Sequence, residues 1–165
     1  MSNYECSLQG IIIGQEQKDR LIQRLVGICG NDSLVDLFEH EIIFTPSTQT
    51  PVGPARNDDV VLRVLVYASY SFEVVRKGHL LAYDKTLKIT VSQLYKLKTK
   101  VDVSSAVHFG REDMWVIEAT SLPVPQEQVN QMAEHLGKFK NSLIGFVELE
   151  YVDNRALQNR IPYST

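Results

Sequence analysis

Residues 72–97 read FEVVRKGHLLAYDKTLKITVSQLYKL, and both halves of this stretch have the pattern of β-strands. Every second residue from Leu87 to Val91 is apolar and the residues between them are polar, which is the period of a strand with one buried face. The polar residues 84–86 separate the two halves, so we predict a hairpin with arms Phe72–Ala82 and Leu87–Leu97. A slip of one residue would exchange the two faces, and the pattern alone leaves that register open.

Further strands are predicted on both sides of the hairpin. Alternating patterns predict strands at Tyr4–Ile12 and Leu37–Thr45, and in the second of these the apolar side chains and His40 face away from two glutamates. Val60–Tyr70 is rich in β-branched residues, which favours a strand buried on both faces. The last two strands are predicted at Met114–Thr120 and Ile144–Val152.

Two amphipathic helices are predicted to accompany these strands. Gln15–Cys29 repeats apolar residues at helical spacing, and Gly30 follows as a plausible helix stop. A second helix follows Pro125 and runs to about Lys140. Residues 45–59 contain three prolines and are expected to form a loop. The order of elements predicts an α+β fold, in which an antiparallel multistranded, barrel-like sheet is flanked by two helices within a single domain, 1–165.

The charge of the chain is unevenly distributed. The net charge is −3, yet Arg76–Lys100 contains seven basic residues and one acidic residue, so this segment carries +6 and the remainder −9. Such a basic region could solvate strand edges, bind nucleic acid or contact an acidic partner. The two cysteines, Cys6 and Cys29, lie among apolar neighbours without a CxxC pair, which predicts buried free thiols. No apolar run is long enough for a membrane helix, so we expect no membrane association.

Motifs for catalysis or for cofactor binding are missing. His40-Glu41 begins like a zinc-binding HExxH motif, but Phe44 occupies the place of the second histidine. We therefore expect no catalytic residue, no cofactor and no metal. One enzymatic alternative stays open: Glu148 and Glu150 share one face of a predicted strand, as do the paired carboxylates of triphosphate-tunnel barrels, which act on substrates such as RNA 5′ triphosphate.

Five blocks of the sequence resemble, in order, the family of subunit 18 of the Mediator complex, the coactivator that links transcriptional regulators to RNA polymerase II. The region between Val60 and Phe72 is shorter here than in that family. The blocks are Tyr4–Gly10, Leu21–Cys29, Phe38–Phe44, Phe72–Val91 and Phe146–Asp153.

The resemblance implies a noncatalytic scaffold subunit of the Mediator head module, located in the nucleus. It implies a β-barrel that pairs with Mediator subunit 20 and captures a C-terminal helix of subunit 8, with RNA polymerase II contacted indirectly and nucleic acid not bound directly. Aromatic side chains are the usual anchors of such interfaces. The aromatic candidates for partner binding are Tyr67, Tyr70, Phe72, Tyr95, Phe109 and Trp115.

Overall fold

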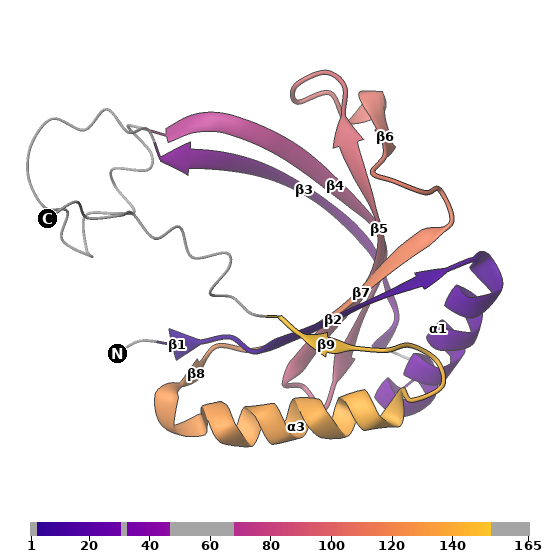
Figure 1. The fold of residues 1–165 in the computed structure, drawn as a ribbon, viewed down its shortest axis with the longest axis vertical. Helices are drawn as coiled ribbons and strands as arrows, with labels where there is room; N and C mark the ends of the chain where they lie inside the picture. The colour runs from indigo at the N-terminus through magenta and orange to yellow at the C-terminus, as the bar shows by residue number, and fades with distance from the viewer. Residues whose placement is uncertain (1–2, 31–32, 47–67, 153–165) are drawn as a thin grey trace, which may run out of the picture.

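The computed structural model describes residues 3–30, 33–46 and 68–152, and Figure 1 shows them as a curved sheet with two helices. This is the α+β class that the sequence predicts. The elements are β1 (Asn3–Tyr4), β2 (Ser7–Ile13), α1 (Gln15–Cys29), β3 (Val35–Pro46), β4 (Ala68–Tyr83), β5 (Leu87–Leu97), β6 (Ala106–His108), β7 (Met114–Ser121), β8 (Val124–Pro125), α3 (Val129–Ser142) and β9 (Glu150–Tyr151).

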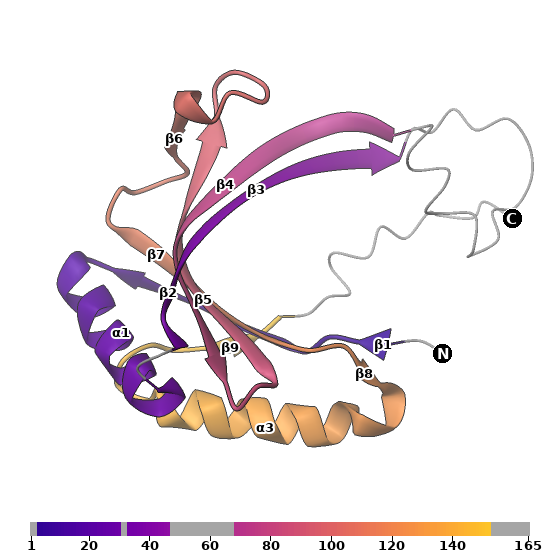
Figure 2. The same ribbon diagram turned by 180° about the vertical axis from the view of Figure 1, so that it is seen from behind.

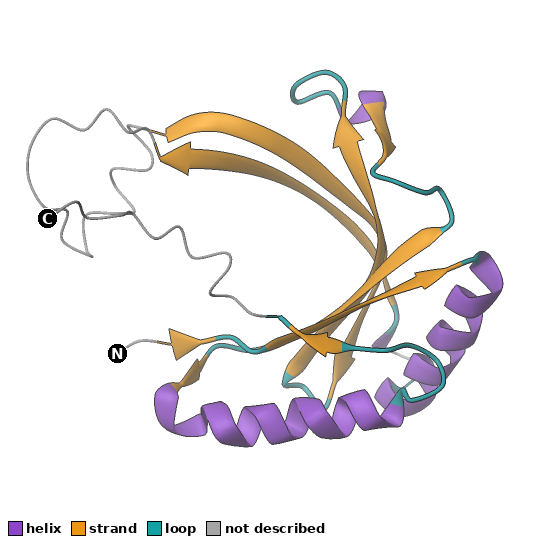
Figure 3. Ribbon diagram, viewed as in Figure 1, coloured by secondary structure: helices purple, strands orange, loops and turns teal. Residues whose placement is uncertain are grey.

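The main sheet has seven antiparallel strands, six of them in the order β3-β4-β5-β7-β2-β9, and β6 adds to β5 (Figure 3). β1 and β8 form a separate two-stranded sheet. Within the described residues β3 and β9 do not pair with each other, so the sheet is barrel-like but does not close into a barrel. One edge of the sheet is therefore the long strand β3.

The predicted hairpin is present as β4 and β5, paired from Val74 opposite Lys96 to Tyr83 opposite Leu87. Asp84 and Lys85 in its turn adopt the left-handed conformation, at φ 49° and 57°, and the amide of Thr86 donates to the carbonyl oxygen of Tyr83 at 3.1 Å. This register places Leu81 beside Ile89 and resolves the ambiguity that the sequence left open.

The core lies between the sheet and the two helices, on the side that we call the helix face. Fully buried side chains of β2, β4, β5 and β7 meet Leu21 and Leu25 of α1 and Leu136 and Phe139 of α3. No helix in the described part of the chain is both long and apolar enough to cross a membrane. Both cysteines are free and half-buried, and burial raises the pKa of each thiol.

The opposite side of the sheet, which we call the open face, carries charged side chains that form ion pairs. Arg76 donates to Glu118 at 2.9 Å and lies 3.5 Å from Glu41, and Lys88 lies 2.9 Å from Glu39. Apolar side chains are buried on the helix face; they include Leu8, Ile89, Val91 and Val147. The buried face predicted from the alternation between Leu87 and Val91 is therefore confirmed, and it is the face that the helices cover.

Three predicted segments differ from the structure or lie largely outside the described residues. The expected loop at 45–59 begins later, because β3 extends to Pro46, and the rest of that segment lies outside the described residues. Of the predicted strand Val60–Tyr70, only the last three residues are described, as the start of β4. The predicted strand Ile144–Val152 buries Val147 and Leu149 as expected, but it is paired as a strand only at Glu150–Tyr151.

His79 of β4 gives the helix face a pH-sensitive position. Its ring stacks on Trp115 at 6.5 Å between centroids, and within the described residues its buried Nδ1 has no hydrogen-bond partner. Burial, reinforced by the charge of Lys18, lowers the pKa of His79, against smaller opposing effects of Asp36 and Asp19. The folded protein therefore favours the neutral imidazole.

We expect His79→Phe to reduce the loss of stability on mild acidification. Because the folded pKa of His79 is depressed, its contribution is complete above the unfolded value of about 6.5 and is lost as the pH falls through the folded value. Phenylalanine retains an aromatic ring against Trp115 and cannot be protonated. Thermal unfolding followed between about pH 7.5 and 5 should show a smaller decrease in Tm for the variant than for the wild type. Equal decreases would show that His79 does not cause the acid sensitivity.

Candidate interaction surface

The apolar stripe of β3 is exposed, although its pattern is that of a buried strand face. Phe38, Ile42 and Phe44 are 58%, 41% and 51% exposed. Phe38 lies opposite Lys77 of β4. Lys77 is on the helix face, because it is four residues before the buried Leu81 in the same strand. The stripe therefore belongs to the face that α1 and α3 cover elsewhere.

The helices leave this region uncovered because the sheet extends past them. Figure 2 shows α1 and α3 at one end of the molecule, while β3 and β4 curve away together toward the other end. We call this projecting part of β3 and β4, with β6 and residues 98–105, the limb. Contiguous exposed apolar side chains on such an element are typical of an interaction site.

Lysine side chains lie across aromatic rings on the same face of the limb. The Nζ of Lys77 is 4.9 Å from the ring centroid of Tyr95 and 5.9 Å from that of Phe38. The Nζ of Lys100 lies 4.0 Å from the ring centroid of Tyr70, and Val101 beside it is 68% exposed. We call this surface the limb patch, and it consists of Phe38, Ile42, Phe44, Lys77, Lys100 and Val101.

The buried carboxylate of Glu73 holds part of the limb patch in place. The Glu73 side chain is 1% exposed and accepts a hydrogen bond from Nε2 of His40 at 2.7 Å. The single N–H of the Val101 amide is shared between the two carboxylate oxygens of Glu73, at 3.0 and 3.1 Å. Burial alone would raise the pKa of Glu73, but hydrogen bonds from His40, the Val101 amide and Tyr70 outweigh it and lower the pKa. Val101 adopts a left-handed φ of 63°, which is unusual for a β-branched residue. The charged Glu73 thus connects the 98–105 segment to β3 and β4.

The aromatic candidates from the sequence divide between the limb and the rest of the fold. Tyr70 and Tyr95 support the limb patch by lying under Lys100 and Lys77. Phe72 and Phe109 are exposed, at 52% and 56%, but neither belongs to the stripe of β3. Trp115 instead packs against the core, with Lys18 over its ring at 5.0 Å. Tyr67 lies outside the described residues.

The sequence pattern did not identify the apolar side chains of β3 as exposed. Phe38 and Ile42 were assigned to one face of a strand, but alternation does not indicate whether that face is covered. The lysines could have indicated it, since Lys77 and Lys100 lie in the basic segment Arg76–Lys100. Their proximity to Tyr95 and Tyr70 depends on pairing between distant residues and is visible only in the structure.

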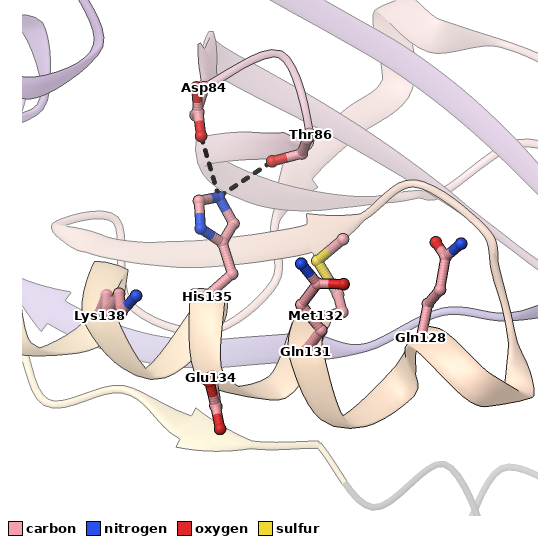
Figure 4. A pocket seen from close by; sticks show the side chains of 8 residues that line it. All are labelled: Asp84, Thr86, Gln128, Gln131, Met132, Glu134, His135 and Lys138. Atoms are coloured by element: carbon pink, nitrogen blue, oxygen red, sulfur yellow. Dashed lines mark hydrogen bonds and ion pairs between the residues drawn. The ribbon is translucent and has the colours of Figure 1, made fainter.

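A pocket of about 420 Å³ lies between the β4–β5 turn and α3 (Figure 4). His135 rises from α3 toward the turn, where its Nε2 is 3.0 Å from Oγ1 of Thr86 and 3.7 Å from Oδ2 of Asp84. Glu134, which also lines the pocket, points away from this contact. The polar groups therefore connect the hairpin to the helix and do not converge on a shared ligand position.

Comparison with known proteins finds a matching family model and similar solved structures. A model of the Med18 protein family matches residues 57–160, more than half of the chain. A chain from the Schizosaccharomyces pombe Mediator head module has a TM-score of 0.65 and 13% identity, covering 90% of this chain and 99% of that chain. The PH1819 protein from Pyrococcus horikoshii OT3 has a TM-score of 0.51 and 12% identity, covering 89% and 93%. No curated protein matches the sequence. At these identities the two structures show a shared fold.

Proposed function

Because this chain belongs to the Med18 family of noncatalytic Mediator subunits, we propose that it is a scaffold of the head module that acts through the limb patch. The observation that carries this proposal is the exposed apolar stripe of β3, which α1 and α3 do not cover. An isolated surface of this kind is stabilised when a partner removes it from water. Because the family is noncatalytic, we do not propose that the chain acts as a triphosphate-tunnel enzyme.

The proposed partners are Mediator subunit 20, as the second member of a heterodimer, and the C-terminal helix of Mediator subunit 8. Both are partners that the resemblance to the family implies, and an uncovered sheet face of mixed apolar and cationic character supports them. In this role the protein is nuclear and reaches RNA polymerase II through the assembled head module. The central contacts are Phe38 and Ile42, because their apolar side chains stand exposed in the middle of β3.

Coexpression with subunits 20 and 8 tests this proposal. The wild-type chain should elute with both subunits in size-exclusion chromatography. The double variant Phe38→Ala/Ile42→Ala should weaken retention about tenfold or more, because truncating interface anchors commonly costs over about 1.4 kcal/mol.

Ile144→Ala is the matched control for this experiment, since Ile144 is 72% exposed but lies just after α3, outside the limb. It should retain both subunits as the wild type does. Circular dichroism should show the same fold for all three proteins. The proposed function is wrong if the folded wild-type chain retains neither subunit, and the assignment to the limb patch is wrong if the double variant binds like the control.

A further inference from the structure

Two lysines of the limb patch have no carboxylate partner among the residues that the structure describes. Within the described residues neither Lys77 nor Lys100 forms an ion pair. The glutamates of β3 face the other side of the sheet, where Glu39 and Glu41 lie near Lys88 and Arg76. Glu73 is on the same face as the lysines, but it is buried and its oxygens are occupied by His40 and Val101. The surface that a partner meets is therefore apolar with uncompensated positive charge.

Aromatic rings hold these two charges in place. Each ammonium group lies over a tyrosine ring, at 4.9 Å for Lys77 and 4.0 Å for Lys100, and such contacts restrict long side chains that are otherwise free to move. A partner carboxylate would meet an ammonium group that is already positioned, so less side-chain entropy is lost on binding. Positioned charges beside exposed apolar groups favour a partner segment with the complementary arrangement.

We propose that the limb patch binds an acidic protein segment whose apolar side chains cover Phe38, Ile42 and Phe44 while its carboxylates pair with Lys77 and Lys100. This inference rests on the proposed scaffold function and specifies the chemistry of the partner. The distribution of charge over the chain agrees with it, since Arg76–Lys100 carries +6 and the rest of the chain −9. An acidic segment is attracted to this region and repelled by the remainder of the molecule.

The same contacts disfavour nucleic acid as the ligand. Single-stranded nucleic acid binds through bases that stack on free aromatic faces. Here the ring of Tyr70 has Lys100 over it, and the ring of Tyr95 lies between Lys77 and His108, whose ring centroid is 4.4 Å away. The most exposed member of the patch is Val101, at 68%, and the exposed Ile42 is also aliphatic; such side chains suit protein side chains better than bases.

Charge reversal tests the inference. Lys77→Glu/Lys100→Glu should weaken binding of the subunit 20 and subunit 8 complex about tenfold or more at low salt. Wild-type affinity should fall as NaCl is raised from about 0.05 to 0.5 M, and the variant should lose most of this dependence. Lys85→Glu/Lys138→Glu is the matched control, because it makes the same change in net charge at exposed sites on the hairpin turn and α3. It should bind like the wild type.

A synthetic probe separates this inference from the proposed function. A short peptide of leucines and glutamates should bind the wild-type chain more tightly than its counterpart with lysines in place of glutamates, and the reversal variant should invert that preference. If the subunits fail to bind but the acidic peptide binds at the two lysines, the scaffold partners are wrong and the chemistry of the patch holds. Equal binding of both peptides, or tighter binding of oligothymidine than of the acidic peptide, would overturn the inference.

Discussion

Gly78→Ala is expected to destabilise the fold by about 3 kcal/mol or more, a large part of the roughly 5–15 kcal/mol that stabilises a typical domain. Gly78 lies in the middle of β4, opposite Leu37 of β3 and Ser92 of β5. A Cβ at this position would lie 2.7 Å from Cα of Ser92 and would overlap the carbonyl oxygen of Val91. Both atoms are backbone, so no side-chain rotation relieves the overlap and the two strands must separate.

Urea unfolding, followed by circular dichroism, measures the effect of Gly78→Ala. Gly27→Ala is the control, because a Cβ at this exposed helical position meets nothing within 4 Å. Alanine there should stabilise the protein by about 0.5–1 kcal/mol, since glycine is a poor helix former. An unchanged urea midpoint for Gly78→Ala would contradict the close approach of β4 and β5.

Local patterns were sufficient to predict α1 and the β4–β5 hairpin. Helical spacing of apolar residues and a glycine at the end gave the bounds of α1, and alternation on both sides of Asp84 and Lys85 gave the hairpin. These features depend on neighbours in the sequence. The same local patterns did not give the bounds of the last strand, which was predicted at Ile144–Val152. Gly145, at φ 86°, belongs to a turn after α3, and the chain reaches strand pairing only at Glu150.

Which side of the sheet is covered could not be predicted from alternation. The patterns of β3 and β5 are similar, yet Ile89 of β5 is fully buried and Phe38 of β3 is largely exposed. The difference arises because α1 and α3 reach the centre of the sheet but not its projecting end. The limb patch also depends on Lys77 meeting Tyr95 and Lys100 meeting Tyr70, contacts between distant residues that the register of β4 and β5 creates.

Phe139→Ala is expected to destabilise the protein by about 3–5 kcal/mol, the usual range for removing a buried phenylalanine ring. The side chain is fully buried on α3 and packs against Tyr83 with 5.1 Å between ring centroids. Its loss leaves a cavity between α3 and the hairpin, where the contact of His135 with Thr86 also holds the two elements together. The urea midpoint should therefore fall substantially.

Two further phenylalanine truncations separate stability from binding. Phe109→Ala removes the same atoms at a site that is 56% exposed. Its free energy of unfolding in urea should therefore stay within about 0.5 kcal/mol of the wild-type value. Phe38→Ala should change the free energy of unfolding equally little, because its ring is 58% exposed. It should nevertheless weaken retention of the partner subunits. If Phe139→Ala unfolded at the same urea concentration as Phe109→Ala, α3 would not be packed as the structure shows. A loss of stability in Phe38→Ala as large as that in Phe139→Ala would mean that β3 supports the core and does not present its stripe to a partner.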